Sequence, residues 1–195
     1  MFNPFASKKK PGNTKKESLR IVDLVERSKE NDEDAFGELY SLYVDSIYRY
    51  IYIKIKVSHE AEDLVQQVFL KAWSSIKTFK YEKFPFSSWL YRIAHNQVID
   101  YYRGKKKGSL SIKEEIIVDQ SNNPAASQDQ KSDKRELERA IRNLPENQQQ
   151  VIILKFIEEL DNKEIAKTIG KSEGAIRVLQ YRALKMLKKI LDIRY

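Results

Sequence analysis

The sequence predicts an all-α fold of two small helical domains joined by a flexible linker, with a helix-turn-helix in the second domain. Apolar residues recur at three- and four-residue steps, and only six glycines occur in 195 residues. The periodicity fades between Gly104 and about Asp133, where small and polar residues are frequent. We predict a flexible basic tail over 1–17, a first domain over 18–104, a linker over 105–133 and a second domain over 134–195.

Composition limits the class of protein. A net charge of +8 and a pI near 9.4 indicate a polyanionic partner, either nucleic acid or an acidic membrane surface. The absence of cysteine excludes disulfides and thiolate metal sites. Apolar runs fall short of the roughly 20 residues that span a bilayer, and the N-terminal lysines precede no apolar core. We therefore expect a cytoplasmic protein with no membrane insertion, no cofactor and no metal.

The first domain is predicted to open with two helices. Leu19, Val22 and Val25 have helical spacing and indicate a first helix. A long amphipathic helix is predicted next, on residues that also recur at three- and four-residue steps: Phe36, Leu39, Tyr43, Ile47, Tyr50 and Ile51. Ile51, Ile53 and Ile55 alternate like a strand, but we predict a helix end there.

A third helix is predicted to begin at Ser58 as N-cap, with acidic residues in its first turns. Its apolar stripe runs from Ala61 to Ile76. Its opposite face carries the polar side chains of Asp63, Gln66, Gln67 and Lys71, and it also carries Leu70. That leucine is compatible with a single exposed apolar residue, which is common, or with a partner-binding face.

The last helix of this domain is predicted to start at a Ser87 or Ser88 cap and to end near Gly104. One of its faces carries Trp89, Arg92, Asn96, Asp100 and Arg103. Aromatic rings stack on unpaired bases, guanidinium groups neutralise phosphates, and amides bind base edges. This face therefore suits unpaired nucleic acid, although a core Trp89 with merely solvated arginines fits the pattern equally well.

The linker is acidic in an otherwise basic chain, with a net charge of −3 from Gly108 to Asp133. It is compatible with a solvated connection or with a segment that lies in a basic channel. The second domain then opens with a helix on Leu137, Ala140, Ile141 and Leu144. Pro145 is predicted to stop that helix and to begin the next, which carries Val151, Leu154 and Ile157.

The segment from Asn162 to Arg182 has helix-turn-helix spacing. Ala166 is small where two helices would cross, Gly170 can end a helix in the left-handed conformation, and Ile176 can pack the second helix on the first. Ser172 is the predicted N-cap of the second helix, and Ile165, Ile169 and Leu179 complete a small core. A plain helical hairpin shares parts of this pattern.

The charge of the C-terminal helix favours DNA. From Lys171 to Tyr195 seven positive side chains face two negative ones, a net charge of +5. A basic second helix can enter the major groove and read base edges with its N-terminal half. The predicted base-reading residues are Arg177, Gln180, Tyr181 and Arg182, and later lysines such as Lys185 would contact phosphates.

These motifs resemble the extracytoplasmic-function (ECF) sigma factors of bacterial RNA polymerase. EAEDLVQQVFLKAW (60–73) is similar to their polymerase-binding helix, and FSSWLYRIAHNQVIDYYR (86–103) is similar to their promoter-melting helix. Leu144-Pro145, SEGAIR (172–177) and Tyr181-Arg182-Ala183 resemble their fourth-region helix-turn-helix. The resemblance covers about Asp34 to Leu191.

The resemblance implies three partners: core RNA polymerase, promoter DNA and an anti-sigma factor. It implies that the polymerase-binding residues are Asp63, Gln66, Gln67 and Leu70. The residues that would hold the melted −10 strand are Lys77, Lys80, Trp89, Arg92, Asn96 and Arg103. The residues that would bind the −35 element are Ser172, Arg177, Gln180, Tyr181, Arg182 and Lys185. The linker would run toward the RNA exit path.

Two departures from the family pattern matter. Val178 and Leu179 stand where many relatives carry polar or basic residues, which predicts weak direct readout there, and Gln67 replaces a frequent glutamate. A stand-alone helix-turn-helix regulator that binds duplex DNA as a dimer is the alternative. An enzyme is disfavoured because the sequence has no HExxH motif, no P-loop and no nucleophile–base pair.

Overall fold

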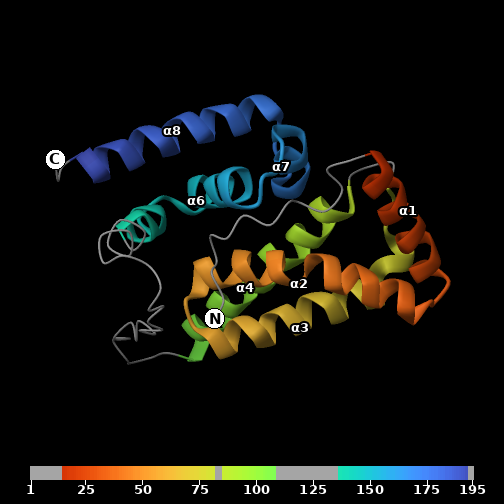
Figure 1. Ribbon diagram of the computed structural model, residues 1–195. Coiled ribbons are helices and arrows are strands. Elements are labelled where there is room, and N and C mark those ends of the chain that lie inside the picture. Colours follow the sequence, from red (N-terminus) through yellow and green to blue (C-terminus); the bar gives the residue numbers. More distant parts are fainter. Residues whose placement is uncertain (1–14, 82–84, 109–135, 193–195) are drawn as a thin grey trace, which may run out of the picture. The chain divides into compact units, whose positions relative to one another are not determined.

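A computed structural model describes residues 15–81, 85–108 and 136–192, and the regular secondary structure in these ranges is helical. The described residues fall into two compact units, 15–108 and 136–192 (Figure 1). The predicted all-α class with two helical domains is confirmed. The predicted tail up to residue 14 and most of the predicted linker lie outside the described residues.

The first unit opens with α1 (Lys15–Lys29), which packs against α2 (Glu33–Ile55). The helix starts inside the predicted tail, at Lys15. Its buried residues are Ile21, Leu24, Val25 and Ser28, whereas Leu19 is 62% exposed. The predicted first helix is confirmed, but Leu19 lies on its exposed side, because the stripe that begins at Ile21 is the one that faces α2.

Asp32 caps α2, and its side chain accepts a hydrogen bond from the backbone N–H of Ala35 at 2.9 Å. The helix continues through the alternating isoleucines to Ile55 and ends at Lys56, whose φ is 57°. Ile51, Ile53 and Ile55 are all buried. The predicted helix end is confirmed. The three isoleucines are buried although they alternate in sequence, because α2 contacts α1, α3 and α4 and so has little exposed surface.

The unit is completed by α3 (Ser58–Ser75), the short 3₁₀ helix η1 (Ile76–Thr78) and α4 (Phe86–Gly108). Val57, not Ser58, is the N-cap of α3, and the Ser58 hydroxyl instead donates to Glu62 at 3.3 Å. Ser87 and Ser88 are buried in the first turn of α4, so neither is its predicted cap. The helix also runs four residues past its predicted end at Gly104.

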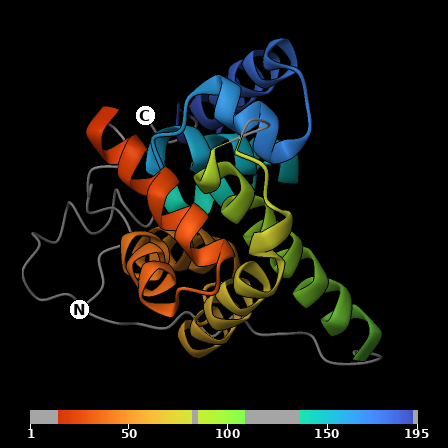
Figure 2. The same cartoon turned by 90° about the vertical axis from the view of Figure 1, so that its right-hand side faces the viewer.

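The second unit contains helical residues 136–142, α6 (Glu146–Ile152), the π-helical turn η2 (Ile153–Ile157), α7 (Asn162–Ile169) and α8 (Glu173–Asp192). As predicted, Pro145 begins α6, where it is the N-cap. Helix α8 packs on both α6 and α7 (Figures 1 and 2). The core between them contains the buried side chains of Val151, Leu154, Ile165, Ile176, Ala183 and Leu187.

Three local features fix the turn between α7 and α8. Asp161 and Glu164 form a capping box at the start of α7. Gly170 ends α7 with a φ of 74° and a ψ of 37°, which is the left-handed conformation that glycine adopts most easily. The Ser172 hydroxyl accepts the backbone N–H of Ala175 at 3.2 Å and so caps α8. The predicted roles of Gly170 and Ser172 are confirmed, and Leu179 is half-buried at the rim of the core.

Within the described ranges, no helix is both long enough and apolar enough to cross a membrane. In the same ranges, no three acidic, histidine or cysteine residues gather where they could hold a metal ion.

Candidate functional site

The outer face of α3 presents four predicted site residues together. Asp63, Gln66, Gln67 and Leu70 are all exposed, and Leu70 is 69% exposed. They lie outside because α3 turns its apolar stripe toward α2 and α4. The buried members of that stripe are Ala61, Leu64, Val65, Val68, Phe69 and Ala72.

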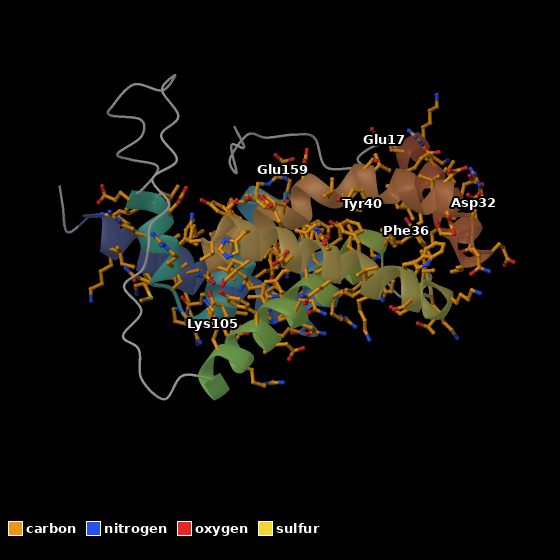
Figure 3. The ribbon with its side chains drawn as sticks, turned by 90° about the horizontal axis from the view of Figure 1, so that it is seen from below. Glu17, Asp32, Phe36, Tyr40, Lys105 and Glu159 are labelled. Atoms are coloured by element: carbon orange, nitrogen blue, oxygen red, sulfur yellow. The ribbon has the colours of Figure 1, made fainter. Side chains whose placement is uncertain are left out.

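Leu70 lies at the edge of an aromatic groove of about 430 Å³. The groove is lined by residues from α2 and α3: Glu33, Phe36, Tyr40, Gln66, Phe69, Leu70 and Trp73. The Phe36 ring centroid lies 4.9 Å from that of Trp73, and the Tyr40 centroid lies 4.7 Å from that of Phe69. Figure 3 labels Phe36 and Tyr40 on α2. Leu70 is therefore part of a larger apolar surface, and the reading of a single exposed leucine is not supported.

Helical periodicity did not predict this groove, because Phe36 and Trp73 both fall in the apolar stripes of their helices. Both side chains are only half-buried, and Tyr40 is 40% exposed. A signal was present in the sequence: aromatic residues are paired four positions apart on two successive helices, at 36 and 40 and at 69 and 73. Residues with this spacing lie on one helix face, so two such pairs predict an aromatic surface.

The second surface lies on α4, where Trp89 is half-buried. Its ring centroid is 5.1 Å from that of Phe79 and 5.5 Å from that of Phe86. Trp89 is thus neither wholly core nor wholly exposed, because one part of the indole packs on two phenylalanines. Phe79, which the sequence analysis did not single out, also holds the segment that carries Lys77 and Lys80 against α4.

The polar members of this surface follow Trp89 along one side of α4 at three- and four-residue steps. Arg92 is half-buried, whereas Asn96 and Arg103 are exposed. The guanidinium of Arg103 pairs with the Asp100 carboxylate at 3.1 Å, which is an exposed contact of little energetic weight. Lys77 and Lys80 are exposed on the neighbouring segment. The structure therefore gathers the six predicted residues on two adjoining elements.

The third surface is the outer face of α8. Arg177, Tyr181, Arg182 and Lys185 are exposed, since Ile176, Ala183 and Leu187 occupy the buried side of the helix. A guanidinium nitrogen of Arg177 lies 3.8 Å from a carboxylate oxygen of Glu173, one turn earlier. Four of the six residues predicted to bind the −35 element thus project from one helix.

The other two have partners within the unit. Gln180 is half-buried, and its side-chain amide donates to the Asn162 side-chain oxygen at 2.8 Å, which ties α8 to α7. Ser172 is the N-cap described above. Both residues position the helix, and their predicted contact with DNA is additional to these roles.

Family matches cover both units. Residues 39–108 match the family described as Sigma-70 region 2, and residues 134–187 match Sigma-70 region 4. The chain is 36% identical over 178 residues to the ECF RNA polymerase sigma factor BldN of Streptomyces coelicolor, covering 90% of this chain and 67% of that one. It is 31% identical over 184 residues to SigW of Bacillus subtilis, covering 89% and 97%.

Two solved structures share the fold. One is CnrH in complex with the cytosolic domain of CnrY, with a TM-score of 0.70 and 21% identity, covering 90% of this chain and 99% of that chain. The other is the sigma factor RpoE of Bartonella quintana in complex with the anti-sigma factor NepR. It has a TM-score of 0.65 and 20% identity, covering 82% and 98% of the two chains.

Together, the helical units and the two matched regions define a sigma factor, the subunit that directs RNA polymerase to promoters. Within that class, the chain belongs to the ECF sigma factors. Core RNA polymerase and promoter DNA are its partners, and the alternative of a stand-alone dimeric regulator is not favoured.

Proposed function

We propose that the three exposed surfaces divide promoter recognition among them. The first domain, 18–104, binds core polymerase through α3 and holds the melted −10 strand through α4. The second domain, 134–195, binds the −35 duplex through α8. The single observation that carries this proposal is the aromatic groove beside Leu70, because it provides an exposed apolar docking surface on the helix that resembles the family's polymerase-binding helix.

Leu70 and the groove would bind polymerase by burying apolar surface. Fully burying a leucine side chain contributes about 1.5–3 kcal/mol. The exposed polar side chains of Asp63, Gln66 and Gln67 precede it by seven, four and three positions on the same side of α3. In an interface the apolar groove would supply most of the affinity, and the polar side chains would lie at its border.

The α4 surface would hold single-stranded DNA. The indole of Trp89 is fixed by Phe79 and Phe86, so little of its freedom would be lost when a base stacks on it. Lys77, Lys80 and Arg103 carry exposed positive charges that can neutralise phosphates. Extraction of a base from the duplex costs a few kcal/mol in stacking, which these contacts would offset.

The α8 surface would lie in the major groove. Arg177 is placed in the N-terminal half of the helix, where side chains reach base edges, and Lys185 lies farther along, where phosphate contacts are expected. The acidic linker would run toward the RNA exit path of the polymerase. Because the protein would act on promoter DNA, we propose that it is located in the cytoplasm.

An anti-sigma factor is a further expected partner. The solved RpoE of Bartonella quintana is bound to one, NepR. On this chain, the groove beside Leu70 offers an apolar surface that such a protein could cover, which would compete with polymerase for α3.

An electrophoretic shift assay tests the proposal against the dimeric regulator. We expect a promoter fragment to be retarded in a sequence-specific manner when the full chain is combined with core polymerase, and only weakly and non-specifically by the chain alone. Tight specific binding to duplex DNA without polymerase would contradict the division of roles.

A further inference from the structure

The DNA-facing side of α8 has an apolar side chain at its centre. Val178 is 48% exposed, and Gly174, Tyr181 and Lys185 share its face because they are four, three and seven positions away, respectively. Arg177 and Arg182 flank that face and are also exposed. The buried residue Ile176 lies on the far side of the helix.

Gly174 shapes the space beside Val178. It lies one turn nearer the N-terminus of α8, and a Cβ added there would have only the Ser172 hydroxyl as a neighbour, at 4.0 Å. With no side chain at this position, the helix can approach a base pair closely there. Val178 is then the next side chain along the centre of the face that would meet the floor of the groove.

The chemistry of valine limits what it can recognise. Its two methyl groups neither donate nor accept hydrogen bonds, and its branched side chain has few rotamers to lose. The edges of the base pairs in the major groove present donors, acceptors and one apolar group, the C5-methyl of thymine. A valine at this position can therefore contact the methyl group of thymine, but it cannot recognise a base pair by hydrogen bonding.

We infer that Val178 is a specificity-determining residue, which reads a T·A pair of the upstream promoter element by van der Waals contact with the thymine methyl. The inference rests on the proposed function of α8. It gives the departure from the family pattern at Val178 a role, in which recognition of a methyl group replaces a hydrogen bond. Leu179 takes no part, because it is half-buried at the core rim.

The chain offers a matched control in Leu184. It is also 48% exposed and lies on the same helix, six residues farther along. Six residues at about 100° each place it about 120° away from Val178 around the helix axis. Leu184→Ala therefore removes a similar exposed apolar side chain that points away from Val178 and lies about 9 Å farther along the helix axis.

The experiment uses holoenzyme formed from the full chain and core polymerase. A preferred upstream element is first selected from a randomised duplex library, and each of its thymines is then replaced by deoxyuridine, which lacks only the methyl. Affinity is measured at one fixed salt concentration.

We expect one replacement to weaken binding about fourfold, the value for loss of one buried methyl group. The Val178→Ala holoenzyme should bind the thymine and uracil duplexes equally, and Leu184→Ala should behave as wild type.

The outcomes are distinguishable. If no thymine in the selected element is sensitive, or if Val178→Ala keeps the full uracil effect, the inference is overturned while the proposed function of α8 stands. If the holoenzyme selects no upstream sequence at all, the function proposed for α8 fails, and the inference fails with it.

Discussion

At Leu70, an effect on binding can be distinguished most clearly from an effect on folding. The residue contributes little to the fold, since more than two thirds of its side chain is in water. It does form one edge of the groove between α2 and α3. An apolar side chain in this position gains free energy only when a partner covers it, so substitution there should alter binding and leave stability largely unchanged.

We predict that Leu70→Arg weakens binding to core polymerase by about 2 kcal/mol, or roughly thirtyfold in Kd, because the variant loses an apolar anchor and brings a charge to an apolar contact. Binding of labelled variants to core enzyme by fluorescence anisotropy measures this directly. Circular dichroism should show unchanged helix content.

Leu19→Arg provides the matched comparison, because Leu19 is 62% exposed in α1 and lies outside the groove. It should bind core polymerase like the wild type. Equal affinities for the Leu70 and Leu19 variants would remove α3 from the proposed interface.

At the scale of the elements, the turn between α7 and α8 depends on one backbone conformation. Gly170 adopts a φ of 74°, and a Cβ built there would meet nothing within 4 Å. We predict that Gly170→Ala lowers the free energy of unfolding of the second unit by about 1 kcal/mol, purely through the cost of the left-handed conformation. Hydrogen exchange of α7 and α8 amides reports on this unit separately.

Gly174→Ala is the control for that measurement. Gly174 lies in the first turn of α8, where alanine has the better helix propensity and space is available. It should leave protection unchanged or raise it. A loss of protection as large as that of Gly170→Ala would show that side-chain bulk, not backbone conformation, decides the effect.

The junction of α1 and α2 depends on an ionised carboxylate. The backbone N–H of Ala35 and the side chain of Arg27 donate hydrogen bonds to Asp32, and these lower the pKa of Asp32 below its ordinary value. A lowered pKa in the folded state means that the stabilisation is complete above the ordinary aspartate pKa of about 4. The stabilisation is then lost as the pH falls through the lower, folded-state value.

We therefore predict that the first unit loses stability on acidification below about pH 4, and that Asp32→Asn loses less over the same interval. Asparagine is a comparable N-cap but does not titrate. Urea midpoints followed by tryptophan fluorescence test this, since Trp73 and Trp89 both lie in the first unit. Parallel pH profiles for the two proteins would show that another group dominates.

The sequence predicted the helices well where a continuous apolar stripe is buried and the opposite face is exposed, as in α3 and α8. It did not show that Leu19 is exposed, because local spacing does not reveal which stripe of a helix packs against a neighbour. It also placed the N-cap of α3 one residue too late, at Ser58 and not at Val57. Two neighbouring positions share almost the same local sequence, so the pattern does not separate them. The groove of Phe36, Tyr40 and Trp73 was missed because tertiary contacts leave these aromatics half-covered, and periodicity treats every apolar residue as core.

In the whole molecule, one basic chain carries two units, each with an exposed surface that we propose binds nucleic acid. The net charge of +8 gives non-specific attraction to DNA, which weakens as salt screens it and as fewer counterions are released. Specificity must then come from the unit surfaces acting together while polymerase holds them. We therefore expect promoter choice to require the chain and polymerase together, with neither able to make it alone.

Transcription in vitro tests whether promoter choice requires both. Sigma-free core polymerase is supplied with the purified full chain and a library of genomic fragments, and the 5′ ends of the transcripts are sequenced. We predict a discrete set of start sites that share an upstream element. These start sites should be absent without the chain and strongly reduced with Leu70→Arg. Start sites scattered as with core enzyme alone would contradict this prediction.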